Sequence, residues 1–394
     1  MRPLLLLLTG LVIGLVSFNW GRSAAGTPHS TPPAAPAFDW ATASNRDLNI
    51  AKVFLTARDV GVTGAMDSLE RMAGADSALF TGGHVIAHAL GRLAIASNKN
   101  DPSVLSQCRP TFQAGCYHGV LEGYLTSLPR VDAPAATRLC TALETDRSRR
   151  YESLECAHGL GHGFIESMSY NLAGALGACD AFGSSELRRE CHDGVFMENT
   201  VHGLGMPSMN VGEGATAASM HTMEHGVPAT GTFRASDPQF PCDSVASQYQ
   251  QSCWGYQPLV IAKFASYDYA KTLAGCAKAP ASSLSNCYRG VGKQSVGWFG
   301  FQLDRVAAMC ATAGSREADC LDGGVEVLVD FTLGSDLPTR LCREARADRR
   351  AGCFTHVGAR MSRIHSEPSS IAQECALAGK KEFIAACVRG SNSQ

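Results

Sequence analysis

Residues 156–163 read Cys-Ala-His-Gly-Leu-Gly-His-Gly, and the opening phrase Cys-x-x-Gly recurs along the chain. Adjacent phrases are 33 to 40 residues apart, except for one interval of 62 residues. Met223-Glu-His-Gly lies midway through that interval, and Gly82-Gly-His-Val lies 34 residues before the first phrase. This period predicts about ten supersecondary units that form an α/α solenoid or a closed toroid. The phrase cysteines, including two with looser endings, are Cys116, Cys156, Cys191, Cys253, Cys287, Cys320, Cys353 and Cys387.

The sequence around the phrases is typical of helices. Apolar residues recur at helical spacing over residues 48–55, Ala, Leu and Glu are common in the flanks, and alternating β-branched stretches are scarce. The predicted fold class is therefore all-α. Each unit is expected to contain a helix, a turn and a second helix that begins near the phrase cysteine. We interpret residues 46–394 as one repeat domain.

Each phrase cysteine has a second cysteine a short distance upstream, so the 16 cysteines fall into eight pairs. A disulfide within each unit would staple its helical hairpin, and closing a loop of this size stabilises a fold by about 3 kcal/mol. Pairing between units, or ligation of metal or haem, is the alternative, although the chain contains no Cys-x-x-Cys. The predicted pairs are Cys108–Cys116, Cys140–Cys156, Cys179–Cys191, Cys242–Cys253, Cys276–Cys287, Cys310–Cys320, Cys342–Cys353 and Cys375–Cys387.

The N-terminus indicates the compartment. Arg2 precedes an apolar run over residues 4–20, and small residues follow at 23–25. Residues 1–25 therefore resemble a secretory signal peptide, or an uncleaved signal anchor that would be the only contact with a membrane. Residues 26–45 are a Pro-rich linker. We expect an exported protein, periplasmic or extracellular, where thiols form disulfides. The net charge of -2, from 34 basic and 36 acidic residues, argues against a nucleic-acid partner.

Histidines are concentrated in the N-terminal units. Nine of the 12 fall between His84 and His225, which divides the domain into a His-rich half, about 46–235, and a charge-lined half, about 236–394. Histidines four residues apart share one helix face and can bind one ion. Imidazole with carboxylate suits iron, copper or zinc, and there are enough ligands for one or two ions. A buried hydrogen-bonded histidine network and surface histidines are the alternatives. The candidate metal ligands are His84, His88, His118, Glu122, His158, His162 and His225.

Glycines interleave with the polar residues of the second helices, as Gly159, Gly161 and Gly163 do. Glycine within a helix costs up to about 1 kcal/mol relative to alanine, so this density needs a reason. Close approach of neighbouring second helices is one reason. The alternative is that the glycines break the helix and expose its backbone to a ligand.

These patterns predict an exported metal-dependent enzyme, oxidative or hydrolytic, with Glu166 or Asp193 as a base or as a support for the metal ligands. Four charged side chains of the C-terminal half are candidates for binding a small polar or anionic substrate, or they pair with one another. A non-catalytic metal-binding or delivery protein and a metal-free interaction scaffold are the alternative functions. The substrate-binding candidates are Arg289, Lys293, Asp322 and Glu326.

Overall fold

The computed structural model describes residues 45–74, 77–144, 146–206, 232–332 and 335–392. The expected signal segment at 1–25, nearly all of the linker at 26–45, the unit at Met223 and the candidate ligand His225 lie outside the described residues. None of the helices in the described ranges is long and apolar enough to cross a membrane.

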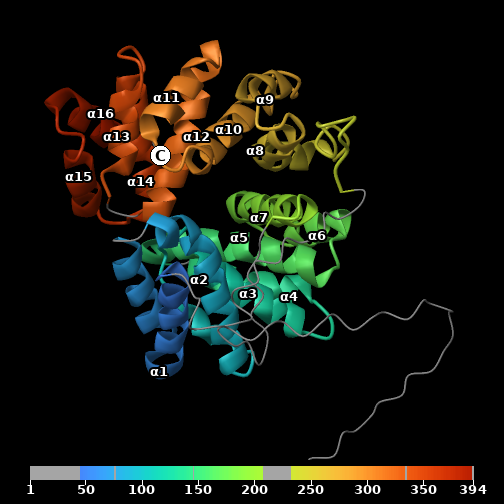
Figure 1. The fold of residues 1–394 in the computed structure, drawn as a ribbon. Coiled ribbons are helices and arrows are strands. Elements are labelled where there is room, and N and C mark those ends of the chain that lie inside the picture. Colours follow the sequence, from blue (N-terminus) through green and yellow to red (C-terminus); the bar gives the residue numbers. More distant parts are fainter. Residues whose placement is uncertain (1–44, 75–76, 145, 207–231, 333–334, 393–394) are drawn as a thin grey trace, which may run out of the picture. The chain divides into compact units, whose positions relative to one another are not determined.

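The described residues are helical and contain no β-strand beyond an isolated bridge between Arg234 and Asp237. The predicted all-α class is therefore confirmed (Figure 1). The helices are α1 (Asn45–Ala73), α2 (Ser77–Ser97), η1 (Pro102–Gln107), α3 (Gly115–Ser127), α4 (Ala133–Glu144), η2 (Arg147–Arg149), α5 (Arg150–Ser167), α6 (Leu172–Cys179), α7 (Ser185–Gly203), α8 (Ser247–Phe264), α9 (Tyr269–Cys276), α10 (Leu284–Trp298), α11 (Leu303–Ala311), η3 (Gly314–Arg316), α12 (Glu317–Thr332), α13 (Leu337–Glu344), α14 (Arg350–Ile364), α15 (Pro368–Ala376) and α16 (Lys381–Ser391).

Most units within the described ranges are helical hairpins, as expected, but two of these units lack a first α-helix. The short 3-10 helix η1 precedes α3, and turns over residues 232–246 precede α8. Pro238 and Pro241 explain the second case, because proline lacks the amide hydrogen that a helix needs. The second helices also begin earlier than predicted in most units. α5, for example, starts at Arg150, more than a turn before its phrase cysteine.

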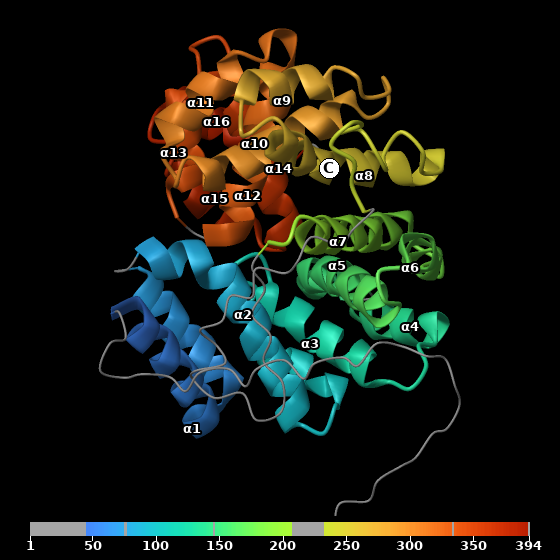
Figure 2. The ribbon, with the colours of Figure 1, turned by 45° about the vertical axis from the view of Figure 1, so that its right-hand side comes forward.

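The second helices contact one another in chain order. α2 packs on α3, α3 on α5, α5 on α7, α7 on α8, and the series continues through α10, α12, α14 and α16 (Figures 1 and 2). α14 also contacts α5, so two helices far apart in the sequence lie together. The solenoid or closed-toroid arrangement remains a prediction.

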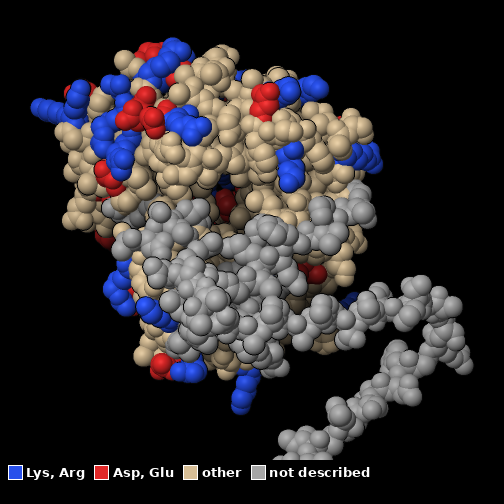
Figure 3. Space-filling model, in the orientation of Figure 1, with Lys and Arg blue, Asp and Glu red and all other residues tan. Residues whose placement is uncertain are grey.

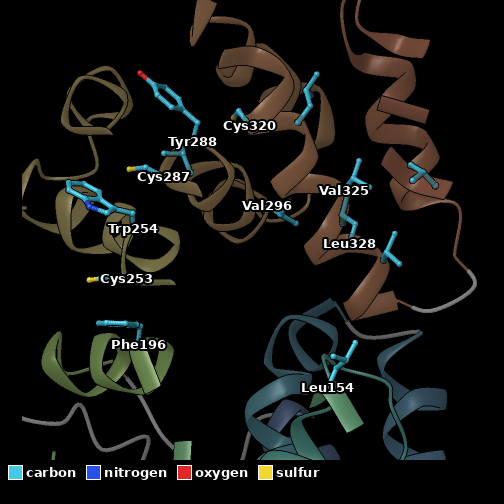
Figure 4. Close-up of a cluster of buried hydrophobic side chains, with 14 of the residues drawn as sticks. Leu154, Phe196, Cys253, Trp254, Cys287, Tyr288, Val296, Cys320, Val325 and Leu328 are labelled. Atoms are coloured by element: carbon cyan, nitrogen blue, oxygen red, sulfur yellow. The ribbon is translucent and has the colours of Figure 1, made fainter. Parts of the chain in front are cut away.

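All eight predicted disulfides are present, and each joins two segments of one unit. No described cysteine is free. The sulfur atoms lie within the apolar core, which runs from unit to unit. Phe196 of α7, for example, lies next to Cys253 and Trp254 of α8 (Figure 4). The disulfides and the core therefore stabilise the same contacts.

The glycines of the second helices permit close backbone contact. A Cβ atom built on Gly323 of α12 would overlap the carbonyl oxygen of Arg289 on α10, and one on Gly292 of α10 would overlap that of Cys320 on α12. This confirms close approach, rather than helix breakage, as the reason for the glycines. The reciprocal pairs are Gly91 with Gly119, Gly161 with Gly194, Gly292 with Gly323, and Gly358 with Gly390.

These contacts correct the predicted alignment of the first unit. The phrase glycines Gly194 and Gly323 each face the carbonyl oxygen of the residue two positions after the preceding phrase cysteine, His158 and Arg289 respectively. Gly119 faces the carbonyl oxygen of His88 in the same way. His88, and not His84, is therefore equivalent to His158. The sequence alignment on Gly82 was wrong by one helical turn.

The glycine contacts predict a sharp difference between two substitutions in α14. Gly358→Ala places a methyl group against the Cys387 carbonyl, and we expect it to destabilise the fold by about 1–3 kcal/mol or more. Gly352→Ala meets nothing within 4 Å, so it should be neutral or stabilise by up to about 1 kcal/mol. Chemical denaturation of the oxidised proteins measures both. Equal stabilities would contradict close backbone packing.

Candidate metal site

Two rows of polar side chains run across α2, α3 and α5. With the corrected alignment, the position two residues after the phrase cysteine holds His88, His118 and His158. The position one turn further along holds Arg92, Glu122 and His162 in the same three helices. Because neighbouring second helices are in contact, each row brings side chains from three units together.

The first row and His84 form a group of three converging imidazoles. His88 Nε2 lies 3.1 Å from His84 Nε2 and 3.2 Å from His118 Nδ1. Nitrogen atoms bound to one tetrahedral zinc ion at about 2.05 Å would be about 3.3 Å apart. Two of the three nitrogen–nitrogen distances among His84, His88 and His118 therefore match a metal site, and all three ligand atoms lie within 4.8 Å of one another.

The hydrogen-bond acceptors near His84 and His88 determine which ring nitrogen carries the proton in each of these two histidines. His84 Nδ1 lies 2.8 Å from the carbonyl oxygen of Phe112, which can only accept a hydrogen bond. His88 Nδ1 lies 3.2 Å from both carboxylate oxygens of Glu122. Each Nδ1 is therefore the donor, and in the neutral rings both Nε2 atoms carry lone pairs. Two lone pairs 3.1 Å apart repel unless a cation lies between them.

The same outer contacts are those that orient metal-binding histidines in proteins, where the second ring nitrogen binds a carbonyl or carboxylate. His118 follows the pattern, because its Nε2 lies 3.4 Å from a carboxylate oxygen of Glu155. Burial and the neighbouring His88 lower the pKa of His84 to about 3. Burial and adjacent histidines also hold the pKa of His118 well below its usual value. These two rings are therefore neutral at physiological pH, as metal ligation requires.

A second group lies beside the first and consists of Glu122, His162 and Glu198. His162 Nδ1 lies 3.2 Å from Glu122 Oε1 and 3.3 Å from Glu198 Oε2. Arg92 donates to Glu122 at 3.0 Å, and the hydroxyl of Tyr170 donates to Glu198 at 3.0 Å. This group has the ligand types for a metal ion, but its charges are already balanced within the protein.

The pKa of His162 shows how that balance arises. Burial opposes its protonation, but the carboxylates of Glu122 and Glu198 raise its pKa to about 9. Burial also opposes ionisation of Glu122, yet His88 and Arg92 hold its pKa well below the usual value. A protonated imidazole thus bridges two carboxylates at neutral pH. A metal ion in this group would have to displace that proton.

The first group borders a polar cavity of about 580 Å³. His84, His118 and the neighbouring His158 line it, whereas His88, Glu122 and His162 lie behind this surface. His158 stacks on His118 with ring centroids 4.9 Å apart, and its buried Nε2 has no hydrogen-bond partner. Acidic atoms are visible deep in a hollow of the face shown in Figure 3. The histidine group is therefore next to space that a small molecule can occupy.

The two candidates for a base have different positions. Asp193 lines the cavity, and burial and Glu190 raise its pKa to about 6. Glu166 is not among the residues that line the cavity, and Arg92 donates a hydrogen bond to its carboxylate at 3.0 Å. Asp193 thus remains a candidate for a catalytic role, whereas Glu166 has the position of a support for Arg92 and, through it, Glu122.

The substrate-binding candidates are divided between two cavities. Arg289, Lys293 and Glu326 line the central cavity, whereas Asp322 lines a separate cavity of about 300 Å³ together with His356. Arg289 and Lys293 form ion pairs with Glu326 at 3.2 and 3.0 Å. The structure therefore contains the mutual pairing that was the alternative interpretation, and the same pairs face the cavity.

Several residues of the site were absent from the candidate ligands. Glu198 belongs to the second group, and Glu155 contacts His118. Glu155 and Glu190 each precede a phrase cysteine directly, and both line the cavity. That position lies three residues before the histidine row and shares its helix face. A polar residue directly before the phrase cysteine is therefore a pattern in the sequence that indicates these two cavity residues.

No family model matches this chain, and no curated protein or solved structure shows significant similarity to it.

Proposed function

We propose that this chain is an exported metal-dependent enzyme whose metal ion is bound by His84, His88 and His118. The observation that carries the proposal is the convergence of three ring nitrogens, two of them with protons fixed on the opposite side of the ring. Eight disulfides favour an oxidising, exported compartment. The rest of the site follows from what borders this group.

The geometry favours catalysis over storage of the ion. Catalytic zinc sites typically have three protein ligands and one open position, whereas structural sites are closed by four. Three imidazoles next to a cavity fit the open type. An ion held in this way supplies Lewis acidity and lowers the pKa of bound water to about 7, which supports hydrolysis.

The protein residues around the ion have separable tasks in this proposal. Glu122 and Glu155 orient the rings of His88 and His118 from behind. His158 lines the cavity, and its buried Nε2 has no hydrogen-bond partner within the protein, so a small shift of the ring would let it accept a hydrogen bond from a substrate or water. Asp193 lines the same cavity and is the proposed base. Copper and iron also bind imidazole, and either of them in place of zinc would favour oxidative chemistry.

Elemental analysis of protein purified without an affinity tag tests the proposal. We expect a stoichiometric transition metal, and its electronic spectrum separates zinc from copper or iron. A metal-free protein with all eight disulfides formed would refute the proposal.

A further inference from the structure

The central cavity is lined by five basic and five acidic side chains, and the carboxylates are shared unevenly among the cations. Glu326 is buried, with 8% of its surface exposed, and it is the carboxylate shared by three partners. Arg289 Nε lies at 3.2 Å, Lys293 Nζ at 3.0 Å and His356 Nε2 at 3.2 Å. Asp322, the other acidic neighbour of Arg289, lies 3.8 Å away and does not line the cavity. Two permanent cations thus depend mainly on one anion.

Other cations of the cavity are paired one to one. Arg360 donates to Asp330, with a distance of 2.7 Å from its Nε, and Arg363 donates to Glu190 at 2.6 Å. These pairs leave little net charge. Arg289 and Lys293 are therefore the cations of this cavity that share one close carboxylate, although Glu155 and Asp193 also line it.

The same part of the cavity has unused hydrogen-bonding capacity. Arg289 Nε is buried and has no hydrogen-bond partner of good geometry, despite its short distance to Glu326. A buried donor without a partner costs about 1–3 kcal/mol, and the Arg289 side chain is part of the cavity lining. A guanidinium favours oxyanions, which accept two parallel hydrogen bonds.

A second cavity continues this positive character. It has a volume of about 510 Å³ and shares Arg189 and Gln251 with the central cavity. Arg189 forms no ion pair within the described part of the chain, and Arg188 donates to the carbonyl oxygen of Phe182 at 2.9 Å. Arg189 therefore lies at the border between the two cavities, whereas Arg188 lines the second cavity.

We propose that the central cavity binds a small oxyanion, a carboxylate or phosphate, through Arg289 and Lys293, with Arg189 drawing it in from the second cavity. That this anion is a substrate rests on the proposed metalloenzyme function. Lys293 lines the same cavity as His84, His118 and His158. An anion at Lys293 would consequently lie close to the histidine group.

Isothermal titration calorimetry with succinate, inorganic phosphate and succinamide tests this proposal. Succinamide matches succinate in shape and lacks its charge. We expect succinate or phosphate to bind, with an affinity that falls as salt rises, and succinamide not to bind. Equal binding of succinate and succinamide, or no binding of either anion at millimolar concentration, would overturn the proposal.

Two variants locate the binding. Lys293→Gln should weaken the anion about tenfold or more, because it removes a charge-assisted contact. Arg189→Gln should weaken it less, and this exposed side chain can be changed without loss of a buried pair. Lys271→Gln removes a surface charge of α9 and serves as the control. Unchanged affinity in both cavity variants would overturn the assignment.

Titration of metal-loaded and chelator-treated protein separates this proposal from the metal proposal. Anion binding to a protein that never contains metal would support the oxyanion site and refute the metal site. Stoichiometric metal without anion binding would give the reverse result.

Discussion

His88→Ala is expected to leave the purified protein without stoichiometric metal. His88 Nε2 is the central atom of the group, because it lies 3.1 Å and 3.2 Å from the other two ligand nitrogens. Its removal leaves His84 and His118 without a shared third ligand. Elemental analysis measures the loss, and non-reducing peptide mapping checks that the eight disulfides still form.

His192→Ala is the matched control for this variant. His192 is also buried and bonds a carboxylate, Asp180, at 3.2 Å, but it belongs to neither histidine group. We expect it to retain metal. Retention of a full metal complement by His88→Ala, or its loss from both variants, would contradict the assignment.

Two further measurements, of metal affinity and of stability against unfolding, extend the test of the metal site. Glu155→Gln should retain metal with affinity reduced about 10- to 100-fold, because it alters only the partner that orients His118. Metal at 100 times its dissociation constant should stabilise the wild type by about 2.7 kcal/mol against unfolding. His88→Ala should show no such difference between metal-loaded and chelator-treated samples.

Complete reduction of the disulfides is expected to unfold the repeat domain. The eight loops span 8 to 16 residues, and each disulfide of this kind contributes about 3 kcal/mol. The total stability of a typical domain is only about 5–15 kcal/mol. The combined contribution of the eight disulfides therefore exceeds the total stability of a typical domain, so the reduced domain is expected to unfold. Far-UV circular dichroism in native buffer, before and after reduction, measures the loss of helix.

A single disulfide allows a graded test. Removal of Cys375–Cys387, by alanine at both positions, should cost about 3 kcal/mol and affect mainly the last unit, α15 and α16. Removal of Cys179–Cys191 should cost a similar amount but loosen α7, which contacts both α5 and α8. Native helix content in the fully reduced protein would contradict this view of the fold.

The repeat phrase made much of this structure predictable. All eight cysteine pairs follow from their spacing, since a cysteine 8 to 16 residues upstream lies on the other arm of the same unit. The helical class followed from apolar spacing, and the glycine contacts followed from glycine density in helices. These features are local, so the order of residues along one unit carries the information.

The repeat period did not predict the structure of the two described units that lack a first α-helix. The repeat implied a helix before α8, but Pro238 and Pro241 override the period at that place. The alignment of the first unit also failed, because α2 has no phrase cysteine to mark its position. Only the contact of Gly119 with the His88 carbonyl fixed it.

The sequence by itself determined which residues are histidines on helix faces and that they come from adjacent units. Only the tertiary structure decided how they divide, with His84, His88 and His118 in one group and His162 bridged between Glu122 and Glu198 in another. The reason is physical. Ligand atoms converge according to the rotation and offset of neighbouring helices, and these depend on backbone contacts between units that no single repeat encodes.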